Sequence, residues 1–202
     1  MKNLTADKEI TFEELCALLE KGECLVLPTD TTFGLVCLAK DKNSLEKLNK
    51  VKLNHSEKLP QVLCTFTQAL KLAEFDERAQ KAAKTFWPGA LTLILKSTDF
   101  AKKILPAETI GLRVPNDNLI LKIMEKLNCP LFASSANIHG QGYTPDLTVI
   151  KQTFAPKGVA VVEGISKNQA SSVVDLTKKE IVFLREGKIC IEDFKKTVSF
   201  AK

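Results

Sequence analysis

Residues 24–32 read Cys-Leu-Val-Leu-Pro-Thr-Asp-Thr-Thr, an apolar run that proline stops and four polar residues follow. An unbroken apolar run of this length is typical of a strand that is buried on both faces of an α/β sheet. Ligands in open α/β sheets bind just beyond the carboxyl ends of the strands, where these polar residues lie. Taken alone, the polar residues are also the composition of a simple turn or helix cap. The stretch therefore predicts an α/β fold and marks one candidate site.

Helical and extended patterns alternate on both sides of this stretch. Thr11 and Glu14 have the spacing of a capping box, and they begin an amphipathic helix that Gly22 ends. Further helices are predicted at 44–52, from a cap at Asp76 to about Phe86, from a cap at Asn116 or Asp117 to about Leu127, after Asp146 and around 191–198. Further strands are predicted at 35–39, 61–66, 91–95, 110–114, 130–133, 158–162, 172–176 and 181–184. Since no repeat or linker divides the chain, residues 1–202 are predicted to form a single α/β domain.

The composition is that of an ordinary soluble globular protein. Hydrophobic residues make up 45% of the 202 residues, charged residues make up 26%, and the formal net charge is +5. This charge favours anionic ligands without implying a polyanion. No apolar stretch approaches the ~18 residues of a membrane span, and the amino terminus lacks the apolar block of a secretory signal. We therefore expect a cytoplasmic protein without a membrane partner.

Several common kinds of catalytic site are absent from the sequence. The six cysteines form no Cys-x-x-Cys pair, so they are interpreted as small buried apolar residues rather than as metal ligands or disulfides. No glycine-rich phosphate loop, dinucleotide-binding motif or nucleophile elbow occurs. The two histidines, His55 and His139, are interpreted as exposed loop residues rather than bases. The chemistry is therefore expected to depend on other residue types.

Cations, hydroxyls and one amide follow the predicted strands and the basic helix. These residues are Thr29, Lys52, Arg113, Ser135, Asn137, Ser171 and Arg185. Each has a simple structural interpretation as a turn residue, a surface ion pair or a solvated lysine. If the ends of the strands meet, however, the same residues converge on an anionic ligand.

Six short motifs follow one another in a fixed order along most of the chain. They are residues 27–35 (LPTDTTFGL), 86–92 (FWPGALT), 111–115 (GLRVP), 135–140 (SANIHG), 171–175 (SSVVD) and 184–187 (LREG). In this order they resemble the signatures of the YrdC family, the threonylcarbamoyl-AMP synthases. The resemblance implies a single domain with a twisted, open mixed sheet and flanking helices.

The resemblance also implies a nucleotidyltransferase. Such an enzyme forms threonylcarbamoyl-AMP and pyrophosphate from L-threonine, bicarbonate and ATP, with Mg²⁺ accompanying the ATP. The product serves the threonylcarbamoyladenosine modification of tRNA, which implies a transient transferase partner and permits contact with tRNA or double-stranded RNA. Because the reaction mainly requires two anions to be aligned, it needs neither a thiol nor an imidazole.

The resemblance assigns a role to each of the residues that follow the strands. Thr29, Arg113 and Ser171 would bind threonine, and the guanidinium would hold the substrate carboxylate in a bidentate manner. ATP would be bound by the other four residues, which are Lys52, Ser135, Asn137 and Arg185. Lys52 and Arg185 would be the catalytic cations. No side chain is implied as a ligand of the metal.

The segment 52–60 (KLNHSEKLP) departs from the family pattern. Members usually carry Lys-x-Arg followed by Lys-Pro-Leu, and here Asn54 stands where the arginine is expected. Loss of a guanidinium that faces phosphates would cost about tenfold to a hundredfold in rate, unless Lys58 or His55 replaces it. The alternative prediction is therefore a YrdC-like protein without synthase activity that binds nucleotide or double-stranded RNA.

Overall fold

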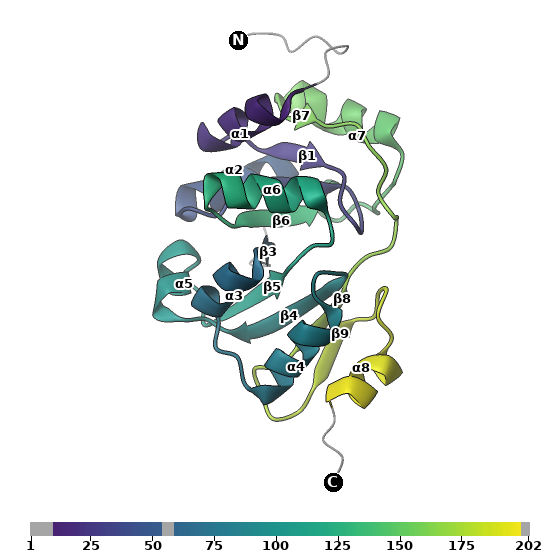
Figure 1. The fold of residues 1–202 in the computed structure, drawn as a ribbon. Helices are drawn as coiled ribbons and strands as arrows, with labels where there is room; N and C mark the ends of the chain where they lie inside the picture. The colour runs from purple at the N-terminus through teal and green to yellow at the C-terminus, as the bar shows by residue number, and fades with distance from the viewer. Residues whose placement is uncertain (1–9, 54–58, 199–202) are drawn as a thin grey trace.

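The computed structural model describes residues 10–53 and 59–198 (Figure 1). Its strands are β1 (Leu25–Leu27), β2 (Gly34–Leu38), β3 (Gln61–Leu63), β4 (Leu91–Lys96), β5 (Thr109–Arg113), β6 (Leu131–Ser135), β7 (Ala160–Val161), β8 (Ser172–Asp175) and β9 (Val182–Arg185). They form one sheet in the order β7-β1-β2-β6-β3-β5-β4-β8-β9. Three neighbouring pairs, β1/β7, β3/β5 and β4/β8, are parallel, and the other pairs are antiparallel. The predicted α/β class and mixed sheet are confirmed.

Helices cover the two faces of this sheet unequally. They are α1 (Phe12–Glu20), α2 (Lys42–Lys52), α3 (Phe66–Leu72), α4 (Glu77–Phe86), α5 (Asp99–Ile104), α6 (Asn118–Leu127), α7 (Leu147–Phe154) and α8 (Ile191–Val198), with a 3₁₀ turn, η1 (Ala155–Lys157), after α7. The buried residues of α1 and α6 form one core with side chains of β1, β2, β3 and β6. Those of the other six α-helices pack on the opposite face. Figure 1 shows α1 and α6 near β1, and α4 and α8 beside β9 at the other end of the sheet.

One region of the sheet therefore lacks a helical cover among the described residues. Side chains alternate between the two faces of a strand. In β4 and β5, Leu91, Leu93 and Leu112 join the larger core, so Thr92 and Gly111 between them belong to the other face. The smaller core, which α1 and α6 cover, contains no residue of β4, β5 or β8. None of the described helices packs its buried residues against this part of the sheet.

Most of the predicted elements are confirmed within a few residues. Thr11 and Glu14 form the expected capping box, and β1 is buried throughout. The predicted strand 61–66 is too long, because β3 ends at Leu63 and Thr65 caps α3 in a capping box with Gln68. The helices α3 and α5 were not predicted. The Thr65–Gln68 spacing was the available signal for α3.

The cysteines are free thiols, and four of the six are buried as predicted. Cys16, Cys24, Cys37 and Cys64 are buried, and the remaining two are partly buried. Burial raises the pKa of the Cys64 thiol, which keeps it protonated and a poor nucleophile. In the described part of the chain, no helix is long and apolar enough to cross a membrane.

Candidate active site

The polar residues after β1 form a hydrogen-bonded turn that is buried. The Thr29 hydroxyl donates to the carbonyl oxygen of Thr32 at 2.8 Å and accepts from the Thr31 amide at 3.0 Å. The two threonine hydroxyls lie 2.9 Å apart. Thr29, Asp30 and Thr31 are 6%, 7% and 2% exposed. The turn interpretation is therefore correct, but these residues are buried among polar partners rather than solvated.

Arg113, at the end of β5, reaches this turn and is only 1% exposed. Its Nη2 forms an ion pair with Asp30, Nη1 donates to the Thr31 hydroxyl at 2.8 Å, and Nε donates to the Gly89 carbonyl at 3.1 Å. Burial lowers the pKa of the guanidinium, and the charge of Asp30 opposes this shift. Because an arginine remains charged even when buried, Arg113 and Asp30 form a buried ion pair. The sequence motifs did not indicate this partnership, and the role in threonine binding stays a prediction.

Lys52, Ser135 and Asn137 form a second group at the end of β6. Lys52 is the last residue of α2 and is 7% exposed, so its interpretation as a solvated lysine is wrong. Its Nζ donates to the Ser135 carbonyl at 2.7 Å and to Asn137 Oδ1 at 3.1 Å. The Ser135 hydroxyl also donates to Asn137 Oδ1, and the Asn137 amide nitrogen donates to the carbonyl oxygen of Ile138 at 3.1 Å. The predicted phosphate-binding residues are thus preorganised around a buried positive charge.

Arg185 and Ser171 begin a third group, which continues to two residues that were not among the predicted site residues. Arg185 donates to the Ser171 carbonyl at 2.9 Å and to the Ser171 hydroxyl at 3.0 Å. That hydroxyl lies 2.9 Å from the hydroxyl of Thr92. Thr92 in turn donates to Gln61 Oε1 at 2.9 Å. The Thr92 hydroxyl has one proton, which it donates to Gln61, so the Ser171 hydroxyl donates to Thr92. Arg185, Ser171, Thr92 and Gln61 therefore form a hydrogen-bond relay that runs in one direction.

Backbone contacts bring the three groups together. In the antiparallel pair β2/β6, Gly34 lies opposite Ser135, and the Ala136 amide donates to the Phe33 carbonyl at 2.8 Å. The Gln169 amide donates to the Thr31 carbonyl at 3.3 Å, which holds the segment before Ser171 against the turn after β1. The charge of Arg185 is close enough to lower the pKa of Arg113 further. All seven predicted residues therefore belong to neighbouring parts of one region.

Asn54, and the substitutes considered for it, His55 and Lys58, lie outside the described residues. His139 is exposed in a loop, as expected. Sequence reasoning missed Asp30 as the partner of Arg113 and Thr92 as the partner of Ser171, although both lie within the six motifs. It had no signal for Gln61, which belongs to none of the six motifs.

Gly187 provides a structural test of the third group. A Cβ at this position would lie 2.3 Å from the Ala170 carbonyl oxygen and 2.6 Å from the Ser171 carbonyl carbon, both backbone atoms. We expect Gly187→Ala to displace Ser171 from Arg185 and to lower the free energy of unfolding by about 1–3 kcal/mol, measured by urea denaturation. Gly142→Ala is the matched control, because a Cβ there meets nothing within 4 Å. Equal stability of the two variants would contradict this account.

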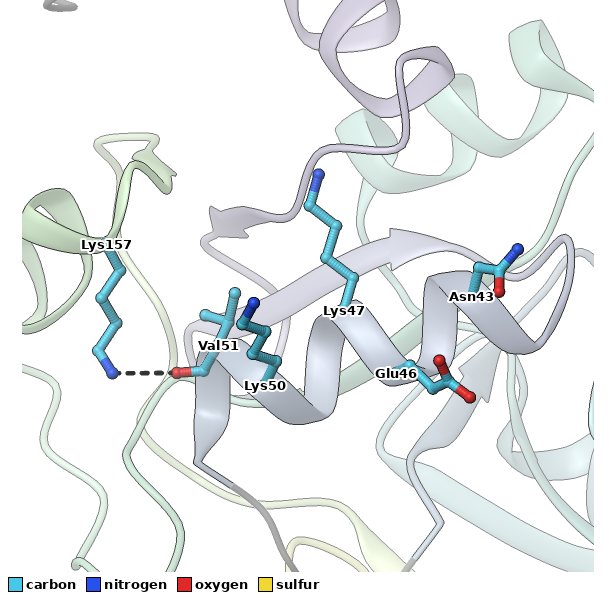
Figure 2. A pocket seen from close by; sticks show the side chains of 6 residues that line it. All are labelled: Asn43, Glu46, Lys47, Lys50, Val51 and Lys157. Carbon is cyan, nitrogen blue, oxygen red and sulfur yellow. Dashed lines mark hydrogen bonds between the residues drawn. The ribbon is translucent and has the colours of Figure 1, made fainter. Parts of the chain in front are cut away.

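A cavity on the surface of the protein lies away from the candidate active site. A cavity of about 620 Å³ lies along the outer side of α2 and is lined by Asn43, Glu46, Lys47, Lys50, Val51 and Lys157 (Figure 2). Lys157 donates to the Val51 carbonyl at 3.2 Å, and Lys47 forms an ion pair with Glu23. None of the predicted site residues lines this cavity, so it is separate from the candidate active site.

Comparison with known proteins agrees with the motif order and the fold. Residues 17–187 match the Sua5/YciO/YrdC family model, which carries the description "Telomere recombination". The chain belongs to the Sua5/YciO/YrdC family. A threonylcarbamoyl-AMP synthase of Pyrococcus abyssi is 29% identical over 187 residues, which cover 89% of this chain. The uncharacterized protein YciO of Escherichia coli is 30% identical over 176 residues, which cover 84% of this chain.

A solved structure extends the comparison to three dimensions. The structure of P. abyssi Sua5 complexed with L-threonine superposes with a TM-score of 0.86, at 28% identity and over 95% of this chain. This chain spans 59% of that Sua5 chain and 55% of the P. abyssi synthase, but 85% of YciO. The Sua5/YciO/YrdC fold is therefore established, and this chain spans little more than half the length of the Sua5 relatives.

Proposed function

We propose that this protein is a threonylcarbamoyl-AMP synthase that acts in the cytoplasm on L-threonine, bicarbonate and ATP. The observation that carries the proposal is the convergence of Lys52, Arg113 and Arg185 with hydroxyl and amide groups in one region beside the turn after β1. Its similarity to a protein named threonylcarbamoyl-AMP synthase and to a Sua5 structure complexed with L-threonine supports the same proposal.

In the proposed reaction, the threonine amine and bicarbonate form a carbamate with loss of water. A carbamate oxygen then attacks the α-phosphorus of ATP, a new P–O bond forms, and the bond to pyrophosphate breaks. Negative charge develops on the phosphate oxygens in this step, and Lys52 and Arg185 would stabilise it electrostatically. Arg113 would hold the threonine carboxylate through N–H groups that Asp30, Thr31 and Gly89 do not use.

In this proposal the described residues are not assigned as ligands of Mg²⁺. They contain no group of three or more His, Cys, Asp or Glu side chains that could hold a metal ion. Asp30, the carboxylate that lies within the site, is paired with Arg113. In this proposal Mg²⁺ therefore enters with the ATP phosphates as part of the substrate, and we assign no step to it.

Pyrophosphate release tests the proposal. The purified protein, incubated with threonine, bicarbonate, Mg²⁺ and ATP, is expected to release pyrophosphate only when threonine is present. Serine and alanine serve as control amino acids, and mass spectrometry of the product identifies threonylcarbamoyl-AMP. A sample that binds ATP but shows no threonine-dependent release would contradict the synthase and favour the alternative of a nucleotide- or RNA-binding family member. If threonylcarbamoyl-AMP is formed, it can be incubated with tRNA and a tRNA-modifying transferase to test whether the threonylcarbamoyl group is transferred to tRNA.

A further inference from the structure

Gln61 lies between the two halves of the proposed site. It begins β3 and pairs with Ala133 of β6, two residues before Ser135 in the phosphate-binding group. Its side chain extends in the other direction, across the position of β5, to the Thr92 hydroxyl on β4. Thr92 contacts Ser171, which is assigned to threonine binding. Gln61 is thus connected to both substrate-binding groups.

The hydrogen bond from Thr92 fixes the orientation of the Gln61 carboxamide. Its Oε1 is occupied as an acceptor, so the NH₂ group of the same planar amide points away from Thr92. No described residue accepts a hydrogen bond from this NH₂ group, and the side chain is partly exposed. A half-buried amide with a fixed orientation and two unused N–H donors is suited to bind an oxygen atom of a ligand.

The strand β5, which lies beneath the Gln61–Thr92 hydrogen bond, leaves space for such a ligand. β5 lies between β3 and β4, and Leu112 pairs with both Val62 and Leu93. The preceding residue, Gly111, presents no side chain on the open face. A Cβ built there would meet only Thr92 Cγ2 at 3.6 Å and Ile94 Cγ1 at 3.9 Å, which are ordinary contacts. The fold itself therefore does not require glycine at this position.

We propose that Gln61 is a further substrate-binding residue, whose NH₂ group donates to an oxygen of the reacting carbamate or α-phosphate above Gly111. This inference rests on the proposed function and deepens it. In the proposed reaction, the carbamate belongs to threonine and the α-phosphate to ATP, so their junction must lie between the two groups that Gln61 connects. Gln61 supplies a neutral donor there, which adds to the charges of Lys52 and Arg185.

Three substitutions distinguish a Gln61 that contacts the substrate from a Gln61 that only supports the hydrogen-bond chain through Thr92. Gln61→Glu keeps an oxygen acceptor for Thr92 but removes the NH₂ donors, whereas Thr92→Val removes the bridge and leaves the NH₂ group in place. We expect kcat for pyrophosphate release to fall by more than about tenfold in Gln61→Glu and by less in Thr92→Val. Gly111→Ala is expected to fold normally and to raise the KM of a substrate, because its methyl group occupies the proposed space.

Control variants and outcomes make the test decisive. Gln152→Glu introduces the same charge change at an exposed position of α7 and should leave kcat unchanged. Gln61→Met tests the loss of the donor without a new charge, and thermal unfolding confirms that each variant is folded. Wild-type activity in Gln61→Glu, or an equal loss in Gln61→Glu and Thr92→Val, would overturn the inference alone. Absence of threonine-dependent release in the wild-type protein would overturn the proposed function and this inference with it.

Discussion

Replacing Lys52 by alanine should lower kcat for threonine-dependent pyrophosphate release by about 10²- to 10³-fold. Lys52 is 7% exposed and is held by the Ser135 carbonyl and Asn137 Oδ1, so its charge is already oriented before substrate binds. A preorganised cation in a region of low water content stabilises charge that develops on phosphates far better than a solvated lysine does. Steady-state kinetics with varied ATP would measure kcat and KM separately.

Lys50→Ala is the matched control for this experiment. Lys50 lies on the same helix, α2, but it is exposed and lines the outer cavity shown in Figure 2. Both variants lose one positive charge from the last turn of the same helix, so general electrostatic effects should be similar. We expect Lys50→Ala to retain wild-type kcat. A similar loss in the two variants would show that the net charge, rather than the position of Lys52, determines the rate.

Replacing Asp30 by alanine should lower the free energy of unfolding by about 3–5 kcal/mol. The substitution removes the carboxylate that faces Arg113, a guanidinium that is only 1% exposed. The remaining charge would be buried without its counter-ion, although Thr31 and Gly89 still accept hydrogen bonds from it. Urea denaturation, followed by circular dichroism, measures the loss.

A double variant separates the contribution of the ion pair to stability from the contribution of side-chain packing. In Asp30→Leu with Arg113→Met, both charges are absent and apolar side chains fill the space, so most of the stability should return. This double variant should nevertheless fail to bind threonine, because Arg113 is the proposed carboxylate ligand. A loss of less than about 1 kcal/mol in Asp30→Ala would instead mean that the guanidinium reaches water and behaves as a surface charge.

Local patterns were sufficient to predict most of the secondary structure. The apolar run before Pro28 became β1, and the Thr11 capping box became the start of α1. Such signals work because they depend on hydrogen bonds and burial within a few residues of the chain. They failed where a short helix follows a strand directly, as α3 does after Thr65. They also failed for β6, which continues through Ser135 because Gly34 and Leu35 of β2 pair with its last residues.

The sequence by itself determined which residue types belong to the candidate site. The six motifs contain all of the predicted residues except Lys52, which opens the segment where Asn54 stands in place of the expected arginine. Only the tertiary structure decided which of these residues contact one another. Asp30 and Arg113 are 83 positions apart, as are Lys52 and Ser135. Such pairs depend on the order and register of strands in the sheet, which local periodicity does not encode. Gln61 shows this most clearly, because its place between the two proposed substrate-binding groups arises from its strand neighbours and not from any motif.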